Sequence, residues 1–272
     1  MTQIYEQKRP RIGAVRYLNA KPLTWAVPRF LPDAALFDDV PSRLAESLVA
    51  GNLDVGLIPS IELARLLGGL QVGDACIACR GPAWSVRILS KVEPKKIQQL
   101  ALDEGSRTSA ALAKIYLAEQ YDLHPDALPL PLELDFHESE ADAVLLIGDR
   151  GMTPHDEELF PYAIDLGEAW HDRTGLPFVF AVWGARSDLV DHDRIAEQLN
   201  AARDEGLSSI DSILSDDAAR MGVSLELCRE YLTSILTYRL GEQEARGLRL
   251  FYAKAAEHGL LDPDSIPEVA IP

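Results

Sequence analysis

The sequence has few cysteines, few positive charges and no long apolar run. Its 272 residues include three cysteines, an odd number too small for a disulfide framework. Lysine and arginine total 26 against 43 aspartates and glutamates, giving a formal net charge of −17. So acidic a chain repels nucleic-acid phosphates and anionic membranes, and no Lys/Arg cluster is large enough to offset this. We therefore expect neither nucleic acid nor a membrane among its partners.

Features of exported and membrane proteins are also missing. No stretch approaches the roughly 20 apolar residues that a membrane-spanning helix needs. The N-terminal segment MTQIYEQKRPR carries positive charge, but the apolar run of a signal peptide does not follow it. Together with the few cysteines, these absences predict a cytoplasmic protein.

The common cofactor and metal motifs do not occur. There is no P-loop, no GxGxxG after the first strand, no GxSxG and no HExxH, and the six histidines are scattered. Cys76 and Cys79 form a CxxC, but they lie in an expected strand, where positions three apart face opposite sides. We interpret both as structural cysteines, and we expect neither a cofactor nor a metal.

Short apolar runs that alternate with helical patterns indicate an α/β fold. Strands are expected at 12–15, 35–37 and 54–58, and helices at 22–30, 41–50 and 60–67, with Ser60 as the N-cap of the third helix. This order implies a largely parallel sheet with helices on its faces.

Two further strands are expected at 75–79 and 84–89, and a second unit of strands and helices then occupies the middle of the chain. Its strands are expected at 100–103, 132–136 and 143–147, with a helix at 106–121 and a loop at 125–131. A strand at 178–183 and mostly helix over 191–258 follow this unit. We predict two lobes that meet at a cleft, a discontinuous lobe 1 (1–90 and 180–272) and lobe 2 (91–179). The ending from Ile266 to Pro272 is expected to be an exposed tail.

Two polar segments follow expected parallel strands, where α/β proteins place ligands. The segment from Arg16 to Pro22, with Tyr17 and Asn19, gathers hydrogen-bonding groups; the alternative is an ordinary exposed loop. In Ser106-Arg107-Thr108-Ser109, Ser106 is the expected N-cap of a helix, and the free N–H groups, hydroxyls and dipole make an anion site. The alternative is a plain capping sequence.

Two further segments are weaker candidates. In Gly148-Asp149-Arg150-Gly151, a glycine allows close approach of the backbone, Asp149 can accept from a hydroxyl, and Arg150 can pair with a carboxylate. The alternative is a surface turn with a local ion pair. In Trp84-Ser85-Val86-Arg87, strand alternation puts Ser85 and Arg87 on one face, which suits a cleft wall or an exposed edge strand.

Several motifs taken in order resemble a known family. They are Ile12-Gly13-Ala14-Val15-Arg16-Tyr17-Leu18-Asn19-Ala20-Lys21-Pro22-Leu23, Asp54 to Ser60, Ser85-Val86, Ser106 to Ser109, Leu146 to Asp149, Asp165 to Trp170, and Thr174 to Ala181. The chain resembles the futalosine-pathway menaquinone enzymes (the MqnA/MqnD family), in particular its chorismate dehydratases. The sibling dihydroxynaphthoate synthases usually open with a Ser-Pro-Cys-Pro-Asn-Asp type motif, where this chain has Tyr17-Leu18-Asn19.

The resemblance implies a two-lobed, periplasmic-binding-protein-like type 2 fold that converts chorismate to 3-[(1-carboxyvinyl)oxy]benzoate and water. It implies a functional role for Asn19 and for the helix-start cluster. With the segments above, the expected substrate-binding residues are Tyr17, Ser60, Ser85, Arg87, Ser106, Thr108, Ser109, Gly148 and Asp149. An amide is not a base, so the expected base is the substrate's own enolpyruvyl carboxylate, with Asp149 or His137 as runners-up.

Two other functions stay open on the sequence alone. One is the sibling synthase reaction, and the other is a non-catalytic cytosolic binder of an aromatic carboxylate. The oligomeric state also stays open between monomer and homodimer.

Overall fold

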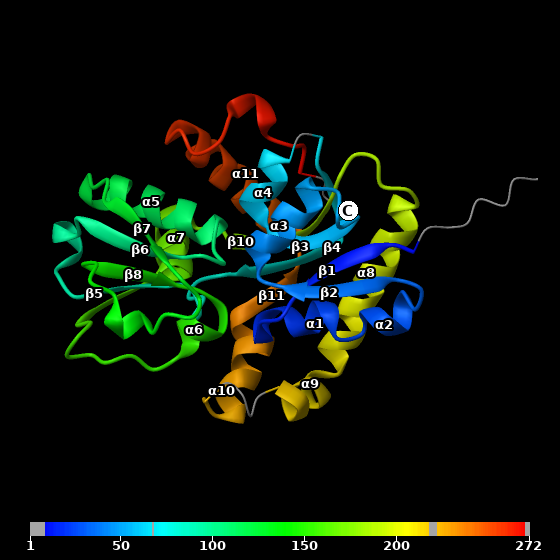
Figure 1. Cartoon of the computed structure of the whole chain (residues 1–272), viewed down its shortest axis with the longest axis horizontal. Helices are drawn as coiled ribbons and strands as arrows, with labels where there is room; N and C mark the ends of the chain where they lie inside the picture. The colour runs from blue at the N-terminus through cyan, green and yellow to red at the C-terminus, as the bar shows by residue number, and fades with distance from the viewer. Residues whose placement is uncertain (1–8, 67, 218–221, 270–272) are drawn as a thin grey trace, which may run out of the picture.

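In the computed structural model, two mixed β-sheets with helices on their faces lie side by side (Figure 1). The structure describes residues 9–66, 68–217 and 222–269. The first eight residues, on which the signal-peptide expectation partly rests, and the last three residues of the expected tail fall outside these ranges. Within the tail, Val269 is buried, so that segment is not exposed throughout.

The first sheet has six strands, with a parallel group at one edge. Its order is β11 (Leu236–Arg239), β4 (Leu70–Cys79), β10 (Phe178–Ala185), β3 (Val55–Pro59), β1 (Arg11–Val15) and β2 (Ala35–Asp39). β1 is parallel to β2 and β3, whereas β10 is antiparallel to β3 and β4. The carboxyl ends of β1, β3 and β4 therefore share one edge with the start of β10.

The second sheet has five strands and the same kind of edge. Its order is β7 (Asp126–Leu130), β6 (Gln99–Asp103), β8 (Ala143–Leu146), β5 (Arg87–Ser90) and β9 (Tyr162–Asp165). β6 is parallel to β7 and β8, and β5 is antiparallel to β8 and β9. Because β5 belongs to this sheet, the chain passes from the first sheet to the second before residue 87.

Helices cover both faces of the first sheet and one face of the second, whose other face packs against Phe136 and Phe160. Those around the first sheet are α1 (Lys21–Thr24), α2 (Val27–Phe30), α3 (Pro41–Val49), α4 (Ser60–Arg65), α8 (His192–Ser208), α9 (Ile210–Asp217), α10 (Leu225–Glu230) and α11 (Glu242–Glu257). Those around the second are α5 (Thr108–Tyr121), α6 (Gly148–Met152) and α7 (Leu166–Thr174). In Figure 1, α3, α4 and α11 lie above the first sheet, and α1, α2 and α8 below it.

Short non-α turns join several of these elements. In the described ranges they include the 3₁₀-helices η1 (Leu18–Ala20), η2 (Pro94–Lys96), η3 (Phe136–Glu138) and η6 (Pro263–Ser265). One is a π-helix, η5 (Tyr231–Ile235), between α10 and β11.

The predicted α/β fold is confirmed, but some elements differ from the prediction. The proline-containing segment expected to be a loop forms strand β7, which tolerates Pro129 because it pairs only with β6 at the sheet edge. The strand expected at 132–136 is a turn that leads into η3. The helix expected at 22–30 is divided into α1 and α2, and β9 and β11 were not predicted.

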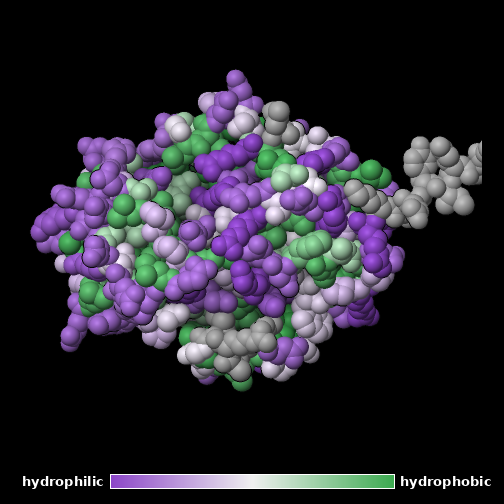
Figure 2. Space-filling view, viewed as in Figure 1, coloured by the Kyte–Doolittle hydropathy of each residue, from purple (hydrophilic) through white to green (hydrophobic). Residues whose placement is uncertain are grey.

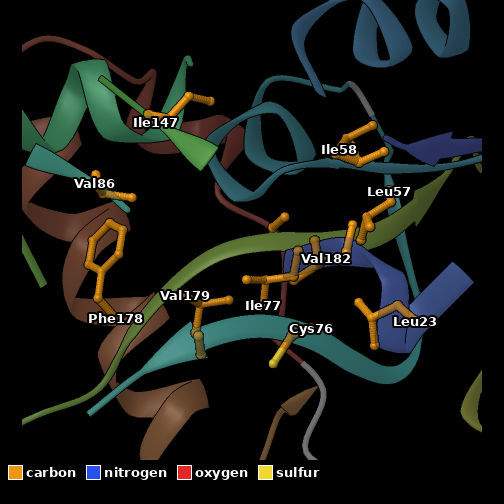
Figure 3. Close-up of a cluster of buried hydrophobic side chains, with 14 of the residues drawn as sticks. Leu23, Leu57, Ile58, Cys76, Ile77, Val86, Ile147, Phe178, Val179 and Val182 are labelled. Atoms are coloured by element: carbon orange, nitrogen blue, oxygen red, sulfur yellow. The ribbon is translucent and has the colours of Figure 1, made fainter. Parts of the chain in front are cut away.

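Most of the buried apolar side chains form one continuous core that includes residues of both sheets. Figure 3 shows part of it, with Ile77 of β4 and Val182 of β10 in the centre and Val86 and Ile147 to one side. Ile77, Val182 and Val86 are 5% exposed or less. Val86, in the segment that crosses from β4 to β5, is thus about as deeply buried as residues of the first sheet.

The crossing from β4 to β5 contains a residue that prevents regular strand geometry. Trp84 has φ +60°, a left-handed conformation that costs a non-glycine residue about 1–2 kcal/mol. The strand expected over 84–89 therefore begins only at Arg87, and the predicted alternation of Ser85 with Arg87 does not apply. The Asp165 carboxylate accepts the N–H groups of Ala83 (2.9 Å) and Trp84 (2.7 Å), which holds this bend in place.

Asp165 is also the N-cap of α7. Replacing it therefore removes both the hydrogen bonds that hold the bend at Trp84 and the cap of this helix. The Asp165 carboxylate accepts the N–H groups of Gly167 (2.9 Å) and Glu168 (3.1 Å). We expect Asp165→Ala to lower the free energy of unfolding by roughly 2–4 kcal/mol, measured by urea denaturation. Asp156→Ala, which removes only the exposed turn contacts of Asp156 with Glu158 and Leu159, is the control and should cost under about 1 kcal/mol. Equal losses in the two variants would contradict the role given to Asp165.

Candidate functional site

A pocket lies where the carboxyl ends of strands in the two sheets face each other. Its open space is about 450 Å³, part of it continuous with solvent. From the first sheet's side it is lined by Val15, Tyr17, Asn19, Pro41, Pro59, Ile77, Phe180 and Ala181. From the second sheet's side it is lined by Val86, Gly105, Ser106, Arg107, Thr108, Ser109, Ile147 and Gly148. Such a position between two α/β units is a usual place for a small-molecule site.

Two polar atoms of this lining are buried without a partner. Asn19 Oδ1 and Ser106 Oγ are both inaccessible to solvent and form no hydrogen bond with the described residues. Leaving a buried polar group unsatisfied costs about 1–3 kcal/mol, so each such group in a folded protein calls for an explanation. These atoms are therefore available to the polar groups of a ligand.

The Ser/Thr cluster at the start of α5 lies in the pocket, but its capping differs from the prediction. The N-cap of α5 is Arg107 and not Ser106, and no side chain caps the helix. The Thr108 hydroxyl accepts the N–H of Ile61 (3.2 Å), which ties α5 to α4 across the pocket. Ser106 is left with a free hydroxyl, and the first turn keeps N–H groups that can bind an anion.

Tyr17 covers the second-sheet side of the pocket through close contact with two glycines. Gly148 has φ +55°, and a Cβ there would lie 2.8 Å from Cδ2 of Tyr17. A Cβ at Gly105 would lie 2.8 Å from the Tyr17 hydroxyl. Burial, with the nearby carboxylates of Asp103 and Asp149, raises the pKa of the Tyr17 phenol, so this side chain is a neutral hydrogen-bond donor.

The other four predicted binding residues lie outside the lining of the pocket. Ser60 is not the N-cap of α4; its hydroxyl donates to the carbonyl of Val179 (2.8 Å). The Ser85 hydroxyl accepts a hydrogen bond from Tyr231 (2.6 Å). Arg87 and Asp149 form hydrogen bonds with backbone groups.

Arg87 and Asp149 bind backbone groups near the pocket. Arg87 Nη2 donates to the carbonyl of Thr153 (3.1 Å), and burial lowers the pKa of its guanidinium. Asp149 Oδ1 accepts the N–H of Leu18 (3.0 Å), which fixes the loop that carries Tyr17 and Asn19 against the second sheet.

One cation lines the pocket, and acidic residues already pair with it. Arg107 Nη1 lies 2.9 Å from Glu62, and Arg107 Nη2 pairs with Glu46. Nearby, Arg16 pairs with Asp39 and Arg150 with Asp103. The pocket therefore offers mostly neutral hydroxyl, amide and N–H groups, not free positive charge.

The histidine and cysteines considered for catalysis or redox chemistry lie outside the lining of the pocket. His137 is in η3 and pairs with Asp135 at 2.7 Å. Cys76 and Cys79 are buried in β4, and desolvation raises the pKa of both thiols, as structural cysteines require. Among the described residues, no three His, Cys, Asp or Glu side chains are grouped as metal ligands would be.

Asp103 is a buried carboxylate directly behind the pocket, and sequence reasoning did not single it out. It accepts the N–H of Gly105 (2.9 Å) and pairs with Arg150 (3.0 Å). Desolvation outweighs these contacts and raises its pKa to about 6. The folded protein therefore binds this proton more tightly than the unfolded chain, in which an aspartate titrates near pH 3.9. The contribution of Asp103 to stability must fall as the pH rises through this window.

We expect this titration to be visible against an Asp103→Asn variant. Between pH 4.5 and 7.5, the free energy of unfolding of the unsubstituted protein should fall by about 2 kcal/mol relative to that of the variant. Urea denaturation of both proteins across this range measures the difference. A difference that stays constant or rises with pH would contradict the raised pKa.

In the ranges described, none of the helices combines the length and the apolar character needed to cross a bilayer. Figure 2 shows hydrophilic residues over most of one face, with hydrophobic residues in scattered groups.

Solved structures of similar shape show the fold. Protein AF1704 from Archaeoglobus fulgidus matches with a TM-score of 0.71 at 18% identity, over 94% of this chain and 100% of the other. The periplasmic aliphatic sulphonate binding protein of Escherichia coli matches with a TM-score of 0.57 at 14% identity, over 97% and 93%. The predicted periplasmic-binding-protein-like fold is thus confirmed.

Sequence comparison shows the family. A chorismate dehydratase from Thermus thermophilus is 30% identical over 261 residues, which are 88% of this chain and 93% of that protein. Another from Campylobacter jejuni is 25% identical over 88% of this chain and 94% of that protein. The family model described as menaquinone biosynthesis matches residues 10–257. The chain therefore belongs to the menaquinone biosynthesis family.

Proposed function

We propose that this protein is a chorismate dehydratase, a hydro-lyase that acts in the cytoplasm on the route to menaquinone. It converts chorismate to 3-[(1-carboxyvinyl)oxy]benzoate and water. The proposal is supported by the family and by two relatives that bear this name. The observation that carries it in the structure is the pocket itself, where unpartnered Asn19 and Ser106 oxygens lie beside the start of α5.

The reaction removes the ring hydroxyl and the hydrogen on the adjacent, ether-bearing carbon. The two electrons of the broken C–H bond form the last double bond of an aromatic ring, and the hydroxyl leaves with a proton as water. Aromatisation drives the elimination. The protein has to hold two carboxylates, position a base at the hydrogen and stabilise the departing hydroxyl.

The pocket offers a group for each binding task. The N–H groups and hydroxyls at Ser106, Thr108 and Ser109 hold one carboxylate at the start of α5. The phenol of Tyr17, whose hydroxyl lies beside Gly105, donates a further hydrogen bond near this cluster. Asn19 Oδ1, which has no other partner among the described residues, accepts a hydrogen bond from the ring hydroxyl and orients it before it leaves, or the Asn19 amide N–H groups donate to the enolpyruvyl arm.

The substrate's enolpyruvyl carboxylate is our proposed base. No aspartate, glutamate, histidine or lysine is among the described residues that line the pocket. Of the runners-up, Asp149 accepts the N–H of Leu18, and His137 pairs with Asp135 outside the lining. An intramolecular carboxylate needs no protein base, because the ether holds it near the ring.

We also propose that two lobes, predicted as 1–90 with 180–272 and as 91–179, close over the substrate, with the boundaries moved so that β5 (Arg87–Ser90) lies in the second lobe and β10 (Phe178–Ala185) in the first. Contacts that cross the pocket support this division: Leu18 with Asp149, Ile61 with Thr108, and Glu62 with Arg107. Closure excludes water, which strengthens hydrogen bonds to a dianion despite the net charge of −17.

The test is to incubate the purified protein with chorismate and to analyse the products by mass and ultraviolet spectrum. The expected result is the loss of one water with the appearance of an aromatic enolpyruvyl ether. Unchanged chorismate with folded protein would overturn the proposal. A ring-closing activity on a cyclic futalosine derivative, or binding without turnover, would replace it.

A further inference from the structure

The one arginine in the described lining of the pocket, Arg107, is held by two carboxylates that differ in exposure. Nη1 of Arg107 lies 2.9 Å from Glu62, whose side chain is 7% exposed. Glu62 also pairs with Arg65, at 2.7 Å. Nη2 of Arg107 pairs with Glu46, whose side chain is 63% exposed. One branch of the guanidinium is thus bound to a buried group, and the other to a group that reaches solvent.

Of these two ion pairs, only the one with Glu46 can be exchanged at little cost. An ion pair between exposed groups adds little stability, because water solvates both charges when they separate. A buried carboxylate that loses a cation has no such compensation. Glu62 therefore anchors Arg107, whereas the Nη2 branch is open to another carboxylate that enters the pocket. Such an exchange leaves Arg107 paired and returns Glu46 to water.

The proposed substrate brings two carboxylates, and the start of α5 accounts for one of them. The groups that hold it there are neutral N–H groups and hydroxyls. A guanidinium binds a carboxylate more strongly, through charge-assisted hydrogen bonds. We propose that Arg107 exchanges Glu46 for the ring carboxylate of chorismate while it keeps its bond to Glu62. The inference rests on the proposed function, because chorismate is the substrate proposed there.

The chemistry of the base decides which carboxylate Arg107 takes. A cation beside a carboxylate favours its ionised form and so makes it a weaker base. The enolpyruvyl carboxylate is the proposed base, and pairing it with Arg107 would oppose the proton transfer. The ring carboxylate takes no part in that transfer, so it can carry the ion pair. The neutral groups at the start of α5 then hold the enolpyruvyl arm.

Two ligands that differ by one carboxylate test this assignment without turnover. The probes are the product, 3-[(1-carboxyvinyl)oxy]benzoate, and 2-phenoxyacrylate, which is the same ether without the ring carboxylate. Arg107→Gln should weaken binding of the product about 10- to 100-fold and binding of 2-phenoxyacrylate less than about twofold, measured by isothermal titration calorimetry. Glu62 keeps its pair with Arg65 in this variant, so no buried charge is left alone. Equal losses for both ligands, or no loss for either, would overturn the inference.

Glu46→Gln tests the exchange from the other side and removes only the exposed contact. Without the competing carboxylate, the protein should bind the product about two- to fivefold more tightly, and KM for chorismate should fall by a similar factor. An ion pair that merely supported the pocket would give weaker binding when it is removed. This variant decides the question even if Arg107→Gln does not fold.

Glu93→Gln is the matched control, because it removes the same charge elsewhere. The side chain of Glu93 is 41% exposed, pairs with Lys95 and Lys96, and lies outside the lining of the pocket. Product binding should stay within about 1.5-fold of its original strength. Unchanged or weaker product binding in Glu46→Gln, or an equal gain in Glu93→Gln, overturns the inference. Absence of chorismate turnover in the unsubstituted protein overturns the proposed function instead, and the binding of the two probes still decides the role of Arg107.

Discussion

Asn19→Ala is expected to lower kcat for chorismate by about 100- to 1,000-fold while substrate binding stays measurable. The expected loss is that of a group that orients the reacting hydroxyl, because a misplacement of about 1 Å can cost about 100-fold or more. Asn19 is the one amide that lines the pocket, and its Oδ1 has no partner in the described part of the chain. The other pocket groups remain, so KM should rise less than about tenfold. Steady-state kinetics with product detection by absorbance makes the measurement.

Asn52→Ala is the control for this prediction. Asn52 lies exposed in the turn between α3 and β3, away from the pocket. Its replacement should leave both kinetic constants unchanged. Turnover of the Asn19→Ala variant at the original rate would remove Asn19 from the mechanism, and a loss confined to KM would make it a binding group only.

Strand order made much of the pocket predictable from sequence. Tyr17 and Asn19 follow β1, the Ser106–Ser109 cluster follows β6, and Gly148 follows β8. A buried apolar run followed by polar residues marks the carboxyl end of a parallel strand, and such ends gather at one edge of a sheet. The sequence therefore placed these residues near one another without a view of the tertiary structure.

Side-chain direction within the loops was not predictable in this way. Ser60 follows β3 directly, yet its hydroxyl bonds to the carbonyl of Val179 and not into the pocket. Ser85 was assigned to one face of a strand, but the left-handed Trp84 breaks that strand, and Ser85 bonds to Tyr231. Capping failed for a similar reason, since Arg107 and not Ser106 adopts the N-cap position. One dihedral angle decides each case, and residue types constrain it weakly.

Long-range partners were also invisible in the sequence. Tyr231 lies in a stretch predicted only to be mostly helical, and Asp165 was noted only within a motif. Tyr231 bonds to Ser85 and Asp165 to Trp84, far away in the chain. A buried hydroxyl or carboxylate must be satisfied, but the sequence does not say by which group.

Gly148→Ala is expected to lower kcat/KM for chorismate by about 100-fold or more. Gly148 has φ +55°, and its new Cβ would lie 2.8 Å from Cδ2 and 2.9 Å from Cγ of Tyr17. The ring must move away, which displaces the phenol and the loop that carries Asn19; a shift of about 1 Å in a catalytic group is enough for such a loss. Crystal structures of the variant or steady-state kinetics would report this displacement.

Gly175→Ala separates the steric contact from the cost of the backbone conformation. Gly175 has φ +66°, and nothing lies within 4 Å of the Cβ that the substitution adds. Gly175→Ala should lose about 1–2 kcal/mol of unfolding free energy, the usual penalty for a left-handed alanine, and Gly148→Ala should lose at least as much because Tyr17 must also move. Only Gly148→Ala should also lose kcat/KM, because only its methyl group meets a pocket residue. Full activity in Gly148→Ala would mean that Tyr17 can leave its place without consequence, and Tyr17 would then have no part in holding the substrate.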